Sequence, residues 1–174
     1  MNYELTDETI EHAGITLHRI RALVDMPIHD VKAGDLGGFI EKVENLQENA
    51  WVSGNAMVYD NARVFGNATV YGNAEVYGNA LVFDNAKVYG NALVSGNALV
   101  YDDAWVSGYA MVYDNAKVYG NALVSGNALV CGNAWVYGDA RVYGDARVSG
   151  TARVSGTASV SGDARVYGTA MVSK

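Results

Sequence analysis

Several features of ordinary proteins are scarce in this chain of 174 residues. It has one cysteine, Cys131, and one proline, Pro27, and its three histidines all precede residue 30. A single cysteine excludes an intramolecular disulfide framework and a cysteine-built metal site, so oxidation chemistry gives no reason to expect secretion. No run approaches the roughly 20 apolar residues of a membrane-spanning helix, and the first 17 residues lack the apolar core of a signal peptide. We therefore expect a soluble, cytoplasmic protein.

Charge of either sign is also scarce in most of the chain. The formal net charge is −7, but residues 1–49 hold ten acidic and four basic side chains, whereas the remaining 125 residues hold nine and eight. A mimic of DNA needs a dense negative stripe, and a DNA-binding protein needs a dense positive one. Residues 50–174 have neither, so we expect no nucleic-acid partner and no membrane partner.

What the chain has in abundance is a six-residue repeat. From Ala50 to Ala170 an alanine recurs at every sixth position, 21 times, and a valine follows each alanine two positions later, from Val52 to Val172. Residues two apart lie on the same side of an extended chain, so each hexad predicts a short strand with an apolar inner face. A helix is excluded because a period of six does not match 3.6 and because the Gly-Asn pairs that recur at six-residue spacing would interrupt it.

The Gly-Asn pairs predict corners between these strands, since glycine and asparagine tolerate positive φ best. Three flat sides give 18 residues per turn, and 21 hexads then predict a triangular column of about seven coils. Valine and alanine fill its interior and leave no room for a ligand. Stacked asparagines are expected to form hydrogen-bonded ladders along the corners.

The hexads resemble the repeat of left-handed parallel β-helices, in which an aliphatic residue and a small residue two positions before it point inward. The segment from Asp30 to Phe39, which leads into the repeat through Glu44-Asn45-Leu46, resembles the start of YdcK-type hexapeptide-repeat proteins of bacteria, prophages and phages. The resemblance implies an all-β, left-handed triangular β-helix. Proteins of this type are often labelled acyltransferases by fold alone, which does not settle their chemistry.

The residues before the repeat predict a separate cap. Apolar and polar residues alternate from Ile15 to Leu23, and Ala13-Gly14 separates them from Thr9–His12, which is typical of a β-hairpin. The first coil of a solenoid needs a polar cover because its backbone groups and apolar cross-section are otherwise exposed. We assign residues 1–38 to an N-terminal β cap and residues 39–174 to the β-helix.

No catalytic residue is recognisable in the repeat. The resemblance implies that an acyltransferase would carry a catalytic histidine on a coil and an inserted loop beside it. Here His12, His18 and His29 all precede the repeat, and no hexad contains an insertion. Cys131 takes an outward position but has no activating neighbour in sequence. We predict no metal and no cofactor, and whether the protein is an enzyme stays open, with the balance against it.

One face of the column is expected to mediate self-association. Outward residues 18 apart stack, and on this face five consecutive aromatic residues predict a continuous apolar ladder. We expect a homo-oligomer, with a trimer favoured over an end-to-end dimer. The expected interface residues are Phe65, Phe83, Tyr101, Tyr119, Tyr137, Leu81, Leu99 and Trp135.

Departures from the repeat mark a candidate ligand site. Asp102-Asp103 replaces a Gly-Asn pair, and Tyr109 replaces a corner asparagine, both close to Trp105. Aromatic side chains can stack on planar groups, and arginines can pair with phosphates. A groove between subunits could combine the two, and the residues expected there are Trp105, Tyr109, Arg141, Arg147 and Arg153.

Together these features predict a non-catalytic, homo-oligomeric β-solenoid that acts as a binding or scaffolding protein. Its ligand could be a small anionic or nucleotide-like molecule or a host protein, and a phage origin would fit the resemblance. A purely structural oligomer and an acyltransferase of the trimeric hexapeptide-repeat type remain the alternatives.

Overall fold

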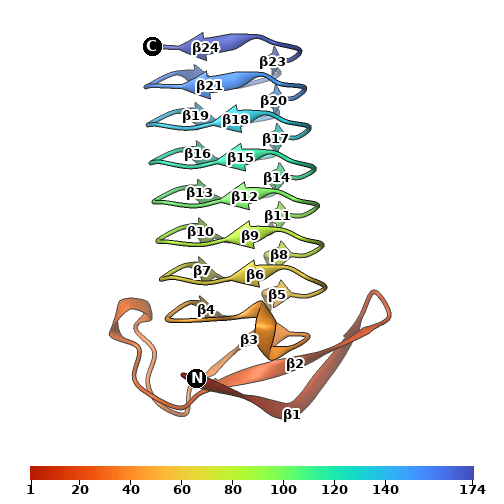
Figure 1. Ribbon diagram of the computed structural model, residues 1–174, viewed down its shortest axis with the longest axis vertical. Coiled ribbons are helices and arrows are strands. Elements are labelled where there is room, and N and C mark those ends of the chain that lie inside the picture. The colour runs from red at the N-terminus through yellow and green to blue at the C-terminus, as the bar shows by residue number, and fades with distance from the viewer.

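The computed structural model describes all 174 residues as a triangular column of stacked coils with a hairpin cap at one end (Figure 1). Each hexad supplies one short strand, and successive strands take the three sides of the triangle in turn. The first face consists of β4 (Trp51–Val52), β7 (Thr69–Val70), β10 (Lys87–Val88), β13 (Trp105–Val106), β16 (Leu123–Val124), β19 (Arg141–Val142) and β22 (Ser159–Val160).

The second face carries the cap as well as coil strands. In spatial order it consists of β1 (Tyr3–His12), β2 (Ile15–Ala22), β3 (Leu36–Ile40), β5 (Met57–Val58), β8 (Glu75–Val76), β11 (Leu93–Val94), β14 (Met111–Val112), β17 (Leu129–Val130), β20 (Arg147–Val148) and β23 (Arg165–Val166).

The third face completes the triangle. It consists of β6 (Arg63–Val64), β9 (Leu81–Val82), β12 (Leu99–Val100), β15 (Lys117–Val118), β18 (Trp135–Val136), β21 (Arg153–Ser155) and β24 (Met171–Ser173). The helical segments are two short 3₁₀ turns before the repeat, η1 (Pro27–His29) and η2 (Val43–Asn45).

The predicted period of 18 residues is confirmed by the strand register. Parallel pairs join Trp51 to Thr69 and Arg63 to Leu81, and the offset continues up the column. Seven complete turns run from β4 to β24, and β3 with a bridge at Leu46 adds an incomplete turn below, so the column has about eight. The coil has the left-handed sense expected from the resemblance, because the strands at the front of Figure 1 run from right to left as the chain climbs from the cap.

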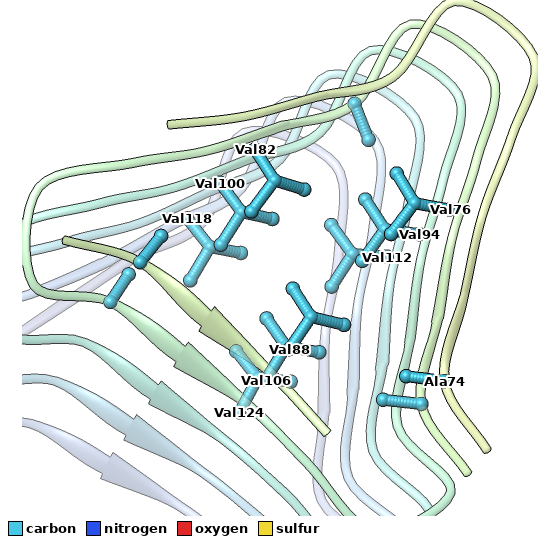
Figure 2. Close-up of a cluster of buried hydrophobic side chains, with 14 of the residues drawn as sticks. Ala74, Val76, Val82, Val88, Val94, Val100, Val106, Val112, Val118 and Val124 are labelled. Atoms are coloured by element: carbon cyan, nitrogen blue, oxygen red, sulfur yellow. The ribbon is translucent and has the colours of Figure 1, made fainter. Parts of the chain in front are cut away.

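The interior is filled as the repeat predicts. From residue 50 to residue 160 every repeat alanine and valine is at most 4% exposed, and Figure 2 shows the valines of the three faces converging on the axis. Each valine contributes about 1.5–3 kcal/mol by leaving water. In the last turn Ala164 and Ala170 are exposed, because no coil stacks on them.

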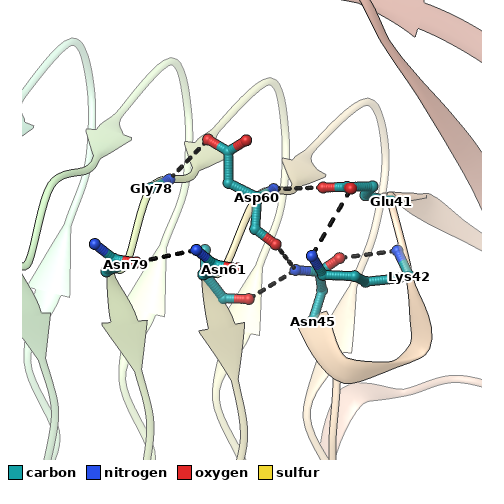
Figure 3. A network of polar contacts seen from close by, with 8 residues as sticks. Glu41, Lys42, Asn45, Asp60, Asn61, Gly78 and Asn79 are labelled. Carbon is teal, nitrogen blue, oxygen red and sulfur yellow. Dashed lines mark hydrogen bonds and ion pairs between the residues drawn. The ribbon is translucent and has the colours of Figure 1, made fainter.

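The corners differ in one respect from the expectation. Glycine takes the positive-φ position, as at Gly90 (φ 75°), but the asparagine after it does not. Where aspartate replaces the glycine, as at Asp60 (φ 57°), its carboxylate accepts the backbone N–H of Gly78 in the next coil at 3.2 Å (Figure 3). Asparagine serves instead in the predicted ladders, in which Asn61 Nδ2 donates to Asn79 Oδ1 at 3.2 Å.

The predicted hairpin is confirmed, and it begins earlier than expected. Strands β1 and β2 pair in antiparallel fashion from Tyr3, and β2 pairs with β3, which in turn pairs in parallel with β5. Strand β3 therefore spans the assigned boundary between residues 38 and 39. The buried Asn45 completes the junction, since its Nδ2 donates to the Ala62 carbonyl oxygen at 2.8 Å and its Oδ1 accepts the Lys42 N–H at 2.9 Å (Figure 3).

Tyr3 connects the cap to the first coil by a hydrogen bond, and its ionisation makes the stability of this junction depend on pH in the alkaline range. Its buried hydroxyl donates to the Leu46 carbonyl oxygen at 2.8 Å. Burial, followed by the charge of Glu44, raises the pKa of Tyr3 to about 12. The unfolded chain, with a tyrosine pKa near 10, therefore loses this proton before the folded chain does. The stabilisation is complete below pH 10 and is lost as the pH rises from 10 towards 12.

We expect Tyr3→Phe to lower the free energy of unfolding at pH 8 by about 1–2 kcal/mol, because buried carbonyl oxygens lose their donor. The difference from wild type should then shrink between pH 10 and 12. Denaturant unfolding at a series of pH values measures both effects, with Tyr167→Phe, at a site 70% exposed, as control. A difference that stays constant up to pH 12 would contradict the assignment.

Candidate functional site

The first face of the column contains a groove of about 620 Å³. One wall is formed by the corner residues that lie two positions before each strand residue of the groove. The floor is formed by the first residue of each strand, whose side chain faces outward. Because both sets recur every 18 residues, each forms a column of side chains along the face. A loop of the cap closes one end. The lining residues are Ile28, Asn67, Thr69, Asn85, Lys87, Asp103, Trp105, Asn121, Leu123 and Arg141.

Trp105 is the central aromatic residue of the groove and is 42% exposed. The Lys87 ammonium lies 5.1 Å from the centroid of the indole, a cation–π contact, and Tyr89 meets the indole edge-on at 6.3 Å. Arg141 lies two coils further along the same floor. The groove therefore offers a flat apolar surface with a positive charge on either side of it along the column.

The cap loop reaches this face through His29. Its Nε2 lies 2.5 Å from the Asn49 carbonyl oxygen, and its Nδ1 lies 3.1 Å from Thr69 Oγ1. Burial is the main cause that lowers the pKa of His29, and the positive charge of Lys87 lowers it further, although the bond to Asn49 opposes this. In the neutral ring Nε2–H donates to Asn49 and Nδ1 accepts from Thr69, so both nitrogens already have partners.

One chain brings only two of the five predicted ligand residues together. Trp105 and Arg141 line the groove, but Tyr109 is an exposed corner residue that does not line it. Arg147 lies on the second face, and Arg153 lies on the third. Six residues advance the chain by one face, so arginines spaced by six point away from one another.

The sequence reasoning missed Lys87, Leu123 and Asp103 as groove residues. The signal was present, because Lys87 and Leu123 lie 18 residues on either side of Trp105 and Asp103 begins the same hexad. The position of Ile28 and His29 had no such signal, since the cap loop lies outside the repeat.

The aromatic ladder predicted for the third face is confirmed. From Phe65 to Tyr137 successive rings stack with centroids 4.9–5.1 Å apart and planes within 4° of parallel. Trp135 lies beside it, with Lys117 Nζ and the Arg153 guanidinium 5.0 and 4.4 Å from its ring centroid. Leu81 and Leu99 on the same face are half-buried. Whether this surface joins subunits stays a prediction.

Two further groups of polar residues lie outside the groove. On the second face, His12 of the hairpin lies 3.3 Å from Glu75 Oε2, which also accepts from the Tyr59 hydroxyl at 3.2 Å. Cys131 is half-buried and lies beside Tyr113. A hydrogen bond between the two side chains is the largest of the causes that raise the pKa of Tyr113 to about 12. A phenol is no base, so Cys131 gains no activating partner from this neighbour.

The structure contains no helix with the length and apolar character that crossing a membrane requires. A comparison with curated proteins gave no match. The family model of the YdcK β-solenoid repeat matches residues 50–64, 62–76, 86–101, 94–108, 116–132, 124–138 and 140–156, which together make up just over half of the chain and lie within the stacked coils. The chain therefore belongs to the YdcK β-solenoid repeat family.

Proposed function

We propose that this protein is a non-catalytic binding protein that captures a small anionic, nucleotide-like ligand in the groove of the first face. The observation that carries the proposal is the exposed Trp105 with Lys87 and Arg141 on the same groove floor. The interior of the column is filled by alanine and valine, so a ligand must bind to the outside.

The spacing of the charges suits a nucleotide. Lys87 and Arg141 are three coils apart, and at about 4.8 Å per coil this is roughly 14 Å. A flat ring on Trp105 would leave the phosphate of a nucleotide within reach of one of the two cations. Arginine suits this role because its planar guanidinium can form two parallel bonds to phosphate oxygens.

We also propose that the chain forms a homo-oligomer, with a trimer favoured, through the third face. The stacked ladder from Phe65 to Tyr137 supports this, because an aromatic strip of this length is larger than the scattered apolar residues of a monomer surface. In such an assembly Arg147 and Arg153 of one subunit could approach the groove of another. A cytoplasmic capture protein encoded by a phage is the biological setting that we propose.

Binding is tested with a panel of nucleoside monophosphates and diphosphates by thermal shift and calorimetry. A ligand at 100 times its Kd should stabilise the protein by about 2.7 kcal/mol. Arg141→Gln should weaken binding about tenfold or more, because a charge-assisted bond is lost. Arg165→Gln, an exposed arginine of the second face, is the control. Intact ligand recovered by mass spectrometry after heating supports capture, and failure of every compound to bind would contradict it.

An acyltransferase is the rival function, and His29 is the observation that bears on it. It is the imidazole nearest to the groove, and burial favours its neutral, basic form. Its two ring nitrogens, however, are occupied by Asn49 and Thr69, which suits an anchor of the loop better than a general base. Conversion of an acyl donor by the wild type that is lost in His29→Asn would establish the enzyme and overturn capture.

A further inference from the structure

The asparagine ladder beside the groove has a direction. Each amide nitrogen donates to the oxygen of the next coil, so Asn67 donates to Asn85 and Asn85 donates to Asp103, both at 3.1 Å. An ionised carboxylate accepts hydrogen bonds but donates none. Asp103 therefore accepts the hydrogen bond from Asn85 but cannot donate one to the side chain of the next coil.

The ladder resumes one coil later with the same direction. Asn121 Nδ2 donates to Asp139 Oδ1 at 2.8 Å, and because the Asp139 carboxylate only accepts, the amide oxygen of Asn121 must point the other way, towards Asp103. Oxygen acceptors thus face each other across one coil spacing with no hydrogen between them. Asp103 takes part in none of the ion pairs of the structure, so no cation of the protein fills this gap.

The gap opens into the candidate site. Asp103, Asn121 and Trp105 all line the groove, and Asp103 and Trp105 are two residues apart in one hexad. An asparagine at position 103 would continue the ladder, because its amide nitrogen could donate a hydrogen bond to the next coil. With aspartate at position 103, the hydrogen bond to the next coil is missing at the centre of the groove, next to the exposed ring of Trp105.

We propose that this break in the ladder is a specificity site for a planar base that carries adjacent N–H donors, as guanine does. The ring lies against Trp105 and Leu123, the Asp103 carboxylate accepts from the ring N–H and one hydrogen of the exocyclic amine, and the Asn121 oxygen accepts the second hydrogen of that amine. The ligand is then a guanine nucleotide whose phosphate pairs with Arg141. This inference rests on the proposed capture function and names its ligand class.

Discrimination against adenine follows from the same atoms. Adenine presents a ring nitrogen lone pair where guanine presents an N–H, and a lone pair facing a carboxylate is repelled. Hypoxanthine keeps the ring N–H but lacks the exocyclic amine, so it should satisfy Asp103 only in part. A site built around hydrogen bonds rejects a ligand that leaves its polar groups unpaired far better than an apolar pocket rejects a wrong shape.

The test is calorimetric titration of the full-length protein with GMP, IMP and AMP. We expect the wild type to bind GMP at least tenfold more tightly than AMP, with IMP between them. Asp103→Asn should weaken GMP binding at least tenfold and leave AMP nearly unchanged. The unliganded variant should melt no lower than the wild type, because the ladder then runs unbroken from Asn67 to Asp139.

Asp102→Asn is the matched control. Asp102 carries the same charge one residue away, but it accepts the Gly120 N–H at 3.1 Å and does not line the groove, so this variant should keep the preference for GMP. Equal affinity of the wild type for GMP and AMP, with binding that depends on Arg141, would overturn this inference and leave anion capture intact. An Asp103→Asn variant that binds GMP like the wild type would also overturn it. Failure of every nucleotide to bind would overturn both proposals.

Discussion

Val100→Asp is expected to abolish the folded column, whereas Val172→Asp, at the same place on the same face, is expected to leave it folded. Val100 is fully buried among valines and alanines, where a carboxylate meets neither water nor a hydrogen-bond donor. Such a substitution destabilises a protein by more than about 4 kcal/mol. Val172 lies in the last turn and is only partly buried, so a carboxylate there keeps its contact with water.

Circular dichroism and denaturant unfolding of the two variants measure this contrast. Because each coil contacts only its neighbours, Val100→Asp has two ways to fail: loss of all ordered structure, or loss of the coils around position 100 with the cap side preserved. Hydrogen exchange separates these outcomes. A Val100→Asp protein that unfolds at the same denaturant concentration as Val172→Asp would refute the packing described for the interior.

The double variant Tyr101→Glu/Tyr119→Glu is expected to be a monomer if the chain forms the homo-oligomer that we propose. The two rings stack with centroids 4.9 Å apart in the middle of the aromatic ladder. Two carboxylates at that separation repel each other, and neither can be buried against another subunit without a partner. Size-exclusion chromatography with light scattering should show a fall in mass from about three chains to one.

The control for this experiment is Tyr71→Glu/Tyr89→Glu. These tyrosines stack at 4.8 Å on the first face, so the control introduces the same charges at nearly the same separation away from the proposed interface. It should keep the mass of the wild type. A wild type that is monomeric at micromolar concentration would rule out the trimer, and a dimer untouched by either pair of substitutions would indicate end-to-end contact.

The coils could be predicted from the sequence because one rule applies at every turn. An offset of 18 residues places Phe65 under Phe83 and Lys87 under Trp105, and the same offset holds for the strands of every other turn. The faces, the filled interior and the stacked aromatic rings all follow from this rule. The same rule places Arg141, Arg147 and Arg153 on three different faces, which is why they form no common site within one chain.

The cap could be predicted only as a hairpin. Its contacts with the column occur once and have no periodic signature, so neither the buried Asn45 nor the position of His29 on Thr69 could be inferred from spacing. The corners show a similar limit. Both glycine and asparagine tolerate positive φ, and only the structure shows that glycine and aspartate use it while asparagine forms the ladders.

The 18-residue register also determines how this chain can fold. Sheets that join distant segments fold slowly, because a long loop must close before any contact forms, whereas each coil pairing here closes a loop of one turn. All turns present the same alanine and valine side chains to the interior. During folding, one turn could therefore be left out of the column, and the turns on either side of it would still stack with valine against valine. Tyr3 on Leu46 and Asn45 on Ala62 have no counterpart higher in the column. The cap therefore fixes which hexads form the first turn, because only these residues make its specific contacts.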